Sequence, residues 1–231
     1  MDLTPDHQTD LEPTRTETTP AESLYQLDQA TNTDAANRPS FLPAAVRQRG
    51  RDLALRREQT RHRAAVARAA NLLQTLPEPG ETIHLVMRGA FQAFDLFAGL
   101  LRLAYPVRVE LCAVATFGFN ARTARLMAEQ LDSGQIKKAC FLGSLMFGHT
   151  HPDAYATVRE VFTSRGHVCG LARNHAKVIA ARLEDGRGFA FAGSANLQRC
   201  RNIETFDLAH DRQLADFHLA WILEAAELSK V

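Results

Sequence analysis

From Thr82 onward the sequence alternates between short β-rich runs and amphipathic stretches, and this alternation limits the possible folds more than any other feature. Short apolar runs bounded by turn residues are typical of strands, whereas apolar residues spaced three and four apart are typical of helices. Strands that alternate with helices favour an α/β layer structure. The expected strands are Ile83–Met87, Val107–Thr116, Ile136–Leu142 and one beginning at Val168, and the expected helices are Ala90–Ala104, Ala121–Asp132, Pro152–Ser164 and Leu214–Leu228.

Two segments of opposite charge precede this pattern. Residues 1–40 carry eight acids against two arginines and few large apolar groups, too little apolar surface to offset the entropy of ordering. We therefore predict a disordered acidic tail over residues 1–42. Between residues 46 and 70, eight arginines lie in an Ala- and Leu-rich stretch, which favours a helix. Pro77 and Gly80 end it, so residues 43–79 are expected to form a basic helix and linker, and residues 80–231 the α/β domain.

The net charge of the whole chain does not favour binding to a polyanion, because 27 basic residues against 26 acidic ones leave only +1. Any preference for nucleic acid must be local, and the arginine-rich helix is the candidate. Its alternative is an ordinary solvated helix, paired with the acidic tail. The expected nucleic-acid-binding residues are Arg47, Arg56, Arg57, Arg61 and Arg63.

Export and membrane insertion are not expected. The N-terminus is acidic and Thr-rich rather than basic and then apolar, and no apolar run is long enough to span a bilayer. The cysteines form no C-x-x-C pair, which argues against a zinc ribbon or a disulfide scaffold and favours reduced core residues in a cytoplasmic protein. They are Cys112, Cys140, Cys169 and Cys200.

The stretch from residue 173 to residue 207 carries most of the reactive side chains. Two apolar runs flank Asp185-Gly186, which predicts a β-hairpin. If the loop has an even number of residues, either this dipeptide alone or residues 184–187, the numbers of paired residues sum to 371. An odd loop would shift the register by one residue and turn one strand's side chains to the other face.

The even register brings four polar side chains together. Lys177 is then opposite Ser194, and His175 is opposite Asn196, with Cβ atoms ~5 Å apart on one face. An imidazole that attacks or protonates, an ammonium and an amide that hold phosphate oxygens, and a small hydroxyl side chain suit chemistry at phosphorus. This chemistry requires no metal.

The same residues resemble a known family. His175-Ala-Lys177 and Gly193-Ser194-Ala195-Asn196, followed by Glu204, are similar to the HxK and GSxN parts of the phospholipase D superfamily motif. The resemblance covers residues 82–210, and it points to the short single-motif members of bacteria and phages, which include half-size endonucleases.

This resemblance implies a two- or three-layer α/β domain with a central mixed sheet, and metal-independent phosphodiester hydrolysis through a phosphohistidine. On this reading His175 is the nucleophile or its acid partner, and Lys177 and Asn196 hold phosphate oxygens. Ser194 lines the pocket, and Glu204 orients and polarises the imidazole. No cofactor is implied.

The resemblance also implies a homodimer, because one copy of the motif supplies one histidine and the leaving oxygen needs a second. The chain departs from the family pattern at Arg182, where the motif has an acid five residues after the lysine.

Other polar groups give weaker signals. His149, His151 and Asp153 have no further ligand at a typical spacing, so no metal site is predicted. Arg88, Thr116 and Asn120 follow strands, where they either line a pocket or serve as turn residues.

We therefore expect a cytoplasmic phosphodiesterase, a nuclease acting on DNA or RNA as a dimer. Two alternatives remain. One is a phospholipase or phosphatidyl transferase, disfavoured because no surface helix rich in Trp or Phe is expected. The other is a catalytically silent module that binds nucleic acid or protein.

Overall fold

The computed structural model describes residues 44–88, 92–198 and 202–229. The tail predicted over residues 1–42 lies outside the described residues. The chain divides after Leu53, and Ala54–Val231 forms one compact unit. This unit includes the second half of helix α2 (Ala44–Leu73). The predicted basic helix is therefore present and extends a few residues beyond its expected ends.

A seven-stranded mixed sheet forms the centre of this unit, in the order β1-β7-β6-β5-β2-β3-β4. β2, β3 and β4 pair in parallel, and the other neighbours pair antiparallel. The α/β class with a central mixed sheet is thus confirmed. The strands are β1 (Thr82–Arg88), β2 (Val109–Ala115), β3 (Ala139–Ser144), β4 (Val168–Ala172), β5 (Val178–Leu183), β6 (Gly188–Gly193) and β7 (Ile203–Ala209).

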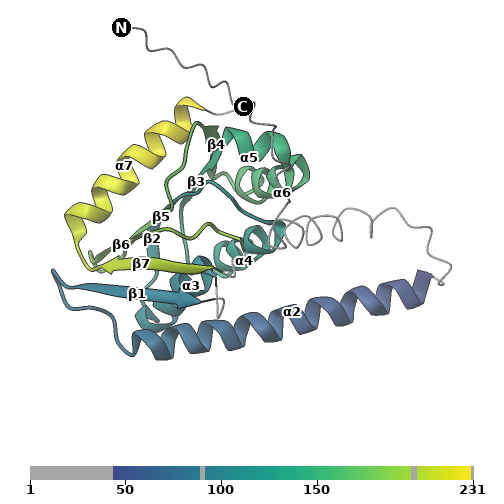
Figure 1. Ribbon diagram of the computed structural model, residues 1–231, viewed down its shortest axis with the longest axis horizontal. Coiled ribbons are helices and arrows are strands. Elements are labelled where there is room, and N and C mark those ends of the chain that lie inside the picture. The colour runs from purple at the N-terminus through teal and green to yellow at the C-terminus, as the bar shows by residue number, and fades with distance from the viewer. Residues whose placement is uncertain (1–43, 89–91, 199–201, 230–231) are drawn as a thin grey trace, which may run out of the picture. The chain divides into compact units, whose positions relative to one another are not determined.

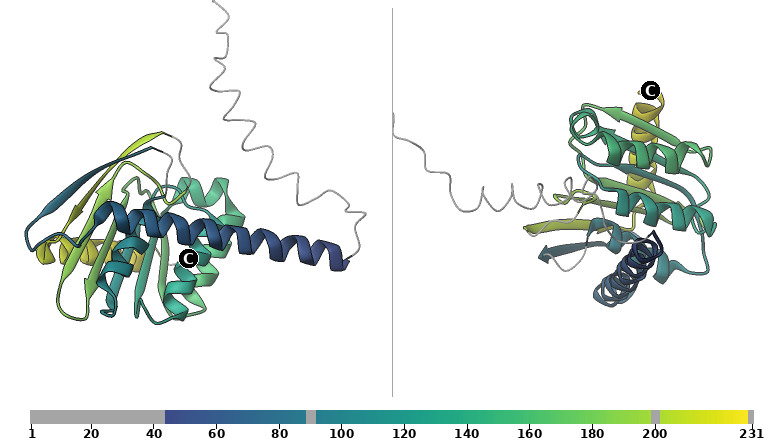
Figure 2. Two further views of the ribbon diagram at one scale, coloured as in Figure 1. Left: turned by 90° about the horizontal axis from the view of Figure 1, so that it is seen from below. Right: turned by 90° about the vertical axis from the view of Figure 1, so that its right-hand side faces the viewer.

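Helices cover both faces of the sheet, which makes three layers (Figure 1; Figure 2). Helix α7 packs on one face, against β2 to β6. The other face carries α3, α4 and α6, and the short α5 follows β3. The helices are α3 (Ala93–Ala104), α4 (Ala121–Asp132), α5 (Leu145–Thr150), α6 (Pro152–Thr163) and α7 (Arg212–Leu228).

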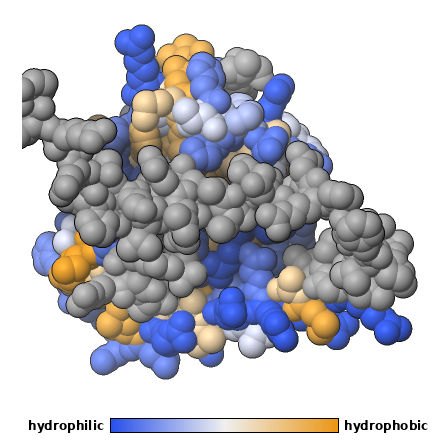
Figure 3. All heavy atoms as spheres, turned by 45° about the vertical axis from the view of Figure 1, so that its right-hand side comes forward, coloured by the Kyte–Doolittle hydropathy of each residue, from blue (hydrophilic) through white to orange (hydrophobic). Residues whose placement is uncertain are grey.

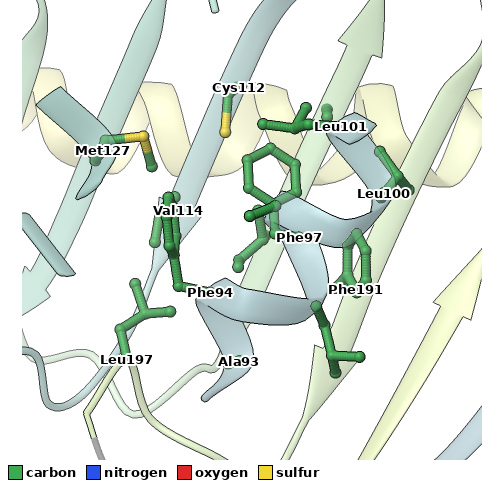
Figure 4. Close-up of a cluster of buried hydrophobic side chains, with 14 of the residues drawn as sticks. Ala93, Phe94, Phe97, Leu100, Leu101, Cys112, Val114, Met127, Phe191 and Leu197 are labelled. Carbon is green, nitrogen blue, oxygen red and sulfur yellow. The ribbon is translucent and has the colours of Figure 1, made fainter. Parts of the chain in front are cut away.

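The core between α3 and the sheet is apolar and aromatic (Figure 4). Successive residues of β2 alternate between the layers: Cys112 and Val114 face α3, whereas Ala113 faces α7. Phe97 of α3 meets Phe191 of β6 edge to face, with ring centroids 6.0 Å apart. From Cys112 to Ala115 both faces of β2 are buried, and this part of the strand is a continuous apolar run.

Most predicted elements occur close to their expected bounds. The helix at Ala121–Asp132 matches residue for residue, and α6 ends one residue early. The third strand begins at Ala139 rather than at Ile136, which makes only an isolated bridge to Val109.

The hairpin register differs from the prediction. β5 pairs with β6 so that Val178 is opposite Ala192 and Arg182 is opposite Gly188, a sum of 370 rather than 371. Leu183 and Arg187 close a three-residue loop through the amide of Leu183 and the carbonyl of Arg187, 2.8 Å apart. Gly186 takes a left-handed conformation with φ of 91°. A turn followed by a left-handed glycine is the usual three-residue hairpin loop, so the even-loop prediction was wrong.

Side chains of α2 join it to α3. Ala69 and Ala70 pack on Gly99, where a Cβ would lie 3.0 Å from the amide nitrogen of Ala70. His62 Nδ1 lies 2.8 Å from Oδ1 of Asp95, and both side chains are buried. The second half of α2 is thus part of the α3 layer.

Cys112, Cys140 and Cys169 are buried, which confirms their predicted core role; Cys200 lies outside the described residues. Burial raises the pKa of Cys169 to about 12. No described helix has the length and hydrophobicity to cross a membrane. On the face shown in Figure 3, the described surface is mostly hydrophilic, with separate hydrophobic spots.

Candidate active site

One edge of the sheet gathers the predicted site residues. β1, β2, β3, β4 and β6 end at this edge, and β5 and β7 begin there. His175 and Lys177 precede β5, Ser194 and Asn196 follow β6, and Glu204 is near the start of β7. Helix α4 begins after β2 at the same edge. Loops at the carboxyl ends of strands are where open α/β sheets usually bind ligands.

His175 and Lys177 contact each other directly. Lys177 Nζ donates to Nδ1 of His175 at 2.9 Å and to the carbonyl oxygen of His175 at 2.8 Å. His175 is exposed and Lys177 is half-buried. Burial lowers the pKa of Lys177, and the charge of Glu204 partly opposes this shift. Since an ammonium that donates to Nδ1 requires a free electron pair there, the neutral ring carries its proton on Nε2, which is then a hydrogen-bond donor.

Asn174 fixes the backbone on both sides of His175. Its Nδ2 donates to the carbonyl oxygens of Leu142 at 3.0 Å and Thr116 at 3.3 Å. Its Oδ1 accepts from the amide of Ala176 at 2.8 Å. The link between β4 and β5 is therefore tied to the ends of β2 and β3. Sequence reasoning missed this residue, although an Asn in an irregular link often bonds to the backbone two residues on.

The ring of Phe117 packs beside His175 and Lys177. Its ring centroid is 4.9 Å from that of His175 and 5.9 Å from Nζ of Lys177. This aromatic contact limits where the imidazole can lie. Phe117 was not predicted, because only Thr116 and Asn120 of the loop after β2 were considered for a pocket rim.

Ser194 and Glu204 form a second pair of contacts. The hydroxyl of Ser194 donates to the carboxylate of Glu204 and accepts from the amide of Thr205 at 3.0 Å. Glu204 was expected to orient the imidazole. Its described hydrogen bond is to Ser194, and it acts on Lys177 through its charge.

Asn196 is held by the loop that carries Phe117. Its Oδ1 accepts from the amide of Gly118 at 3.3 Å, and the next residue, Leu197, donates its amide to the carbonyl of Gly118 at 2.9 Å. With its oxygen engaged, Asn196 presents its carboxamide nitrogen as the donor.

The site residues meet through contacts other than the predicted opposed pairs. Lys177 is opposite Gly193, whose amide donates to the carbonyl of Lys177 at 3.2 Å. Among the described residues, the side-chain hydrogen bonds pair His175 with Lys177 and Ser194 with Glu204. His175 and Asn196 each contact the loop after β2, His175 through the ring of Phe117 and Asn196 through the amide of Gly118.

Arginines of α2 lie on an exposed surface. Glu58 pairs with Arg122 at 3.2 Å and Arg125 at 3.8 Å, in the first turns of α4. This contact and the His62–Asp95 pair place residues 58–62 beside the starts of α4 and α3. The exposed predicted arginines are Arg56, Arg57, Arg61 and Arg63; the side chain of Arg47 lies outside those described.

Of the three residues considered for a pocket rim, Thr116 and Asn120 make contacts that stabilise the fold. Thr116 is buried, and its hydroxyl donates to the carbonyl of Gly118 at 2.9 Å. Asn120 caps α4 by accepting from the amide of Thr123 at 2.9 Å. The side chain of Arg88 lies outside the described ones.

Arg182, where the chain departs from the family pattern, lies in a charge cluster. Its guanidinium donates to Glu110 of β2 at 2.9 Å and to Asp216 of α7 at 3.3 Å. These carboxylates raise the pKa of Arg182, and its hydrogen bond and charge lower the pKa of Glu110. The basic residue at this position thus has two acidic partners.

A cavity of about 490 Å³ lies at the opposite edge of the sheet rather than at the predicted site. It is lined by the hairpin turn and the start of α7, including Asp185, Arg187 and Arg212. Among the described residues, no three His, Cys, Asp or Glu side chains cluster as metal ligands would.

No protein family model matches the chain, and no curated protein matches it. Similar solved structures include a phospholipase D family member, Nuc from Salmonella typhimurium, at 14% identity and a TM-score of 0.49 over 65% of this chain and 97% of that chain. A polyphosphate kinase from Porphyromonas gingivalis has 14% identity and a TM-score of 0.48 over 62% of this chain and 26% of that chain.

A phosphatidylserine synthase from Haemophilus influenzae has 18% identity and a TM-score of 0.44, over 64% of this chain and 38% of that chain. This chain thus spans well under half of the kinase and of the synthase.

Proposed function

We propose that this protein is a metal-independent phosphodiesterase that acts on nucleic acid as a homodimer. The observation that carries the proposal is the contact between an exposed His175 and a half-buried Lys177, 2.9 Å apart, on a sheet edge that also presents the amide of Asn196. An imidazole next to fixed cationic and amide donors suits attack on a phosphodiester.

The reaction would proceed in two displacements. A ring nitrogen of one His175 forms a bond to phosphorus while the bond from phosphorus to the leaving oxygen breaks, and a second imidazole gives that oxygen its proton. Water then attacks phosphorus, the phosphorus–nitrogen bond breaks, and the proton lost by water returns to the second imidazole. Lys177 and Asn196 hold the non-bridging oxygens throughout.

The proposed dimer supplies the second imidazole. In the described arrangement Nδ1 of His175 accepts from Lys177, which requires a neutral ring; the copy that protonates the leaving oxygen must instead carry a proton on both ring nitrogens. The attacking copy needs a nitrogen with a free electron pair facing phosphorus, so the two copies would hold different proton states. A symmetric pair of exposed histidines allows this division of roles.

Nucleic acid is proposed because of the arginines on α2. Arg56, Arg57, Arg61 and Arg63 are exposed, and arginine contacts to phosphates supply affinity that does not depend on sequence. Replacing all four with Ala should weaken DNA binding and flatten its salt dependence, while the turnover of a small phosphodiester stays unchanged.

A lipid substrate is the second candidate, and α7 favours it. This helix exposes Leu214, Phe217 and Leu228, with Phe217 63% exposed. The sequence argument against a lipid substrate was the lack of a surface helix rich in Trp or Phe, and Phe217 is a single exposed aromatic residue on such a helix. A phospholipase would use such a face at a bilayer surface.

The test compares single-stranded DNA, duplex DNA, RNA and phosphatidylcholine vesicles in EDTA, with His175→Ala as the control. We expect cleavage of a nucleic acid, unaffected by chelator and lost with His175→Ala, and a phosphohistidine trapped by acid-free quenching. Cleavage of the vesicles alone would replace this substrate class with lipid. Binding to DNA with neither cleavage nor a trapped intermediate would identify a silent binding module.

The pH profile gives a second check. A reaction that needs one neutral and one protonated imidazole has a bell-shaped profile. Burial lowers the pKa of Lys177 from 10.5. Activity should therefore fall further at alkaline pH, and this fall should begin at a lower pH than the deprotonation of a free lysine. Lys177→Arg should remove that loss.

Subunit mixing tests the dimer. Wild-type protein co-refolded with an excess of His175→Ala protein should lose more activity than dilution predicts, because mixed dimers have one histidine. Activity in strict proportion to the wild-type fraction, or a monomeric mass of an active enzyme, would contradict the shared site.

A further inference from the structure

A row of aromatic rings leads away from His175. The ring of His175 contacts Phe117, at 4.9 Å between centroids, and Phe117 contacts Phe147 at 6.4 Å. Phe147 in turn stacks on His151 at 4.2 Å, with the two planes 7° apart. These rings come from three segments that meet at the site edge: the loop after β2, helix α5, and the link before β5.

The outer end of this row is held in a fixed orientation. Phe147 is buried and also contacts Phe119, at 4.8 Å. Nδ1 of His151 is hydrogen-bonded to Oγ1 of Thr150 at 2.9 Å, and the amide of His151 donates to the carbonyl of Phe147 at 2.9 Å. A ring fixed in this way loses little freedom when something stacks on it.

Among the described residues, only one face of the His151 ring has a stacked aromatic neighbour. Phe147 covers the inner face in a nearly parallel stack, yet His151 as a residue is exposed. A flat, exposed aromatic face backed by a second ring is a surface on which another planar ring can stack.

We infer that the exposed face of His151 is a nucleobase-stacking subsite, which selects single-stranded nucleic acid as the polymer whose phosphodiester reaches His175. This inference rests on the proposed function and narrows its substrate class. Bases of a single strand are free to stack on protein rings, and such stacking is tolerant of sequence. In a duplex the bases stack on one another, and a phospholipid headgroup has no aromatic ring to place there.

The experiment measures binding without cleavage, using protein that carries His175→Ala. Its affinity for a labelled single-stranded DNA is compared, by fluorescence anisotropy, with that for a strand of the same length and charge in which every nucleotide is abasic. We expect tighter binding of the strand with bases. Adding His151→Ala should weaken binding of that strand roughly 5- to 100-fold and leave the abasic strand unchanged.

Two further variants keep the test sharp. His149→Ala removes a neighbouring exposed histidine of α5 and should leave both affinities unchanged. His151→Phe restores a flat ring without the imidazole and should recover most of the lost affinity. Melting temperatures confirm that each variant is folded.

The inference is overturned if His151→Ala weakens both strands equally, which would indicate a charge effect, or if it weakens neither. It is also overturned if His151→Ala instead lowers binding to phosphatidylcholine vesicles. These outcomes are separate from failure of the proposed function, because a wild-type protein that cleaves nothing can still distinguish bases from abasic sugar in this assay.

Discussion

The two ends of the β5–β6 hairpin carry similar residue types with opposite arrangements. At the turn end, Arg187 pairs with Asp185 at 2.7 Å, and Arg212 bonds to Asp216 and to the carbonyl of Gly186. At the open end, the ammonium of Lys177 bonds to the imidazole and carbonyl of His175, neither of which carries a full negative charge.

This difference separates charges that stabilise the fold from a charge that is available to a ligand. A guanidinium bonded to a carboxylate has its charge balanced, so an added phosphate gains little there. A lysine that is partly removed from water and bonded to a ring and a carbonyl oxygen gains more from an incoming anion, although the charge of Glu204 offsets part of this gain. The cavity at the turn end is therefore the less promising anion site.

The largest expected effect is on catalysis. Lys177→Ala should lower kcat/KM by about 100- to 1,000-fold, the usual loss when one fixed donor to a developing charge is removed. Arg187→Ala, a cation removed from the other end of the same hairpin, should leave kcat/KM unchanged. Steady-state kinetics on the best nucleic acid substrate measure both. Comparable losses from the two variants would mean that the two ends do not differ in function.

Gly193→Ala should give the largest loss of stability. A Cβ at Gly193 would overlap the carbonyl oxygen of Thr205 on the neighbouring strand, and a paired backbone has little room to move. We expect about 3 kcal/mol of lost unfolding free energy, measured by urea denaturation. Since Ser194 accepts from the amide of Thr205, activity should fall as well. A variant as stable as wild type would show that β6 and β7 separate easily at the open end.

Gly186→Ala tests the glycine of the turn end. Gly186 has φ of 91°, and the nearest atom to an added Cβ is Nη1 of Arg212 at 3.8 Å, an ordinary contact. The unfavourable backbone conformation of Ala is therefore expected to lower the unfolding free energy by about 1 kcal/mol. Gly186→Asn should cost less, because Asn tolerates this conformation, and activity should persist in both variants. A loss as large as that of Gly193→Ala would indicate that the loop conformation also sets the register.

The layered fold was predictable from the sequence because periodicity reports burial directly. The run at residues 121–132 has apolar residues on one helical side, and the helix formed there with the same bounds. The strand at Ala139–Ser144 was displaced at its start because Ile136 is apolar and buried without belonging to the strand. An apolar side chain thus predicts burial more reliably than strand pairing.

The hairpin register could not be predicted in the same way. Asp185-Gly186 is compatible with hairpin loops of two, three or four residues. The left-handed conformation of Gly186, which is typical of the three-residue loop, cannot be read from the sequence. Asn174 and Phe117 were missed for a related reason: their contacts are with residues more than 30 positions away or across the sheet edge. Sequence spacing identifies candidates for a site but not the distant residues that support them.

The smallest expected effect concerns the ion pair at the turn end. Arg187 lowers the pKa of Asp185 below 3.8, first through its side-chain hydrogen bond and then through its backbone bond and charge. A carboxyl with a lowered pKa in the folded state stabilises the protein above its unfolded pKa, and this contribution is lost as the pH falls through the folded value. Both side chains are about one-third exposed, so we expect at most about 0.5 kcal/mol.

Unfolding free energies of wild type and Arg187→Ala between pH 7 and pH 2 measure this contribution. The difference should be present at neutral pH and shrink below about pH 4, because protonated Asp185 gains nothing from the guanidinium. Arg187→Lys keeps a charge and should fall between the two. A difference for Arg187→Ala that stays constant with pH would mean that Arg187 acts through packing, and that the two ends of the hairpin are less distinct than their charges indicate.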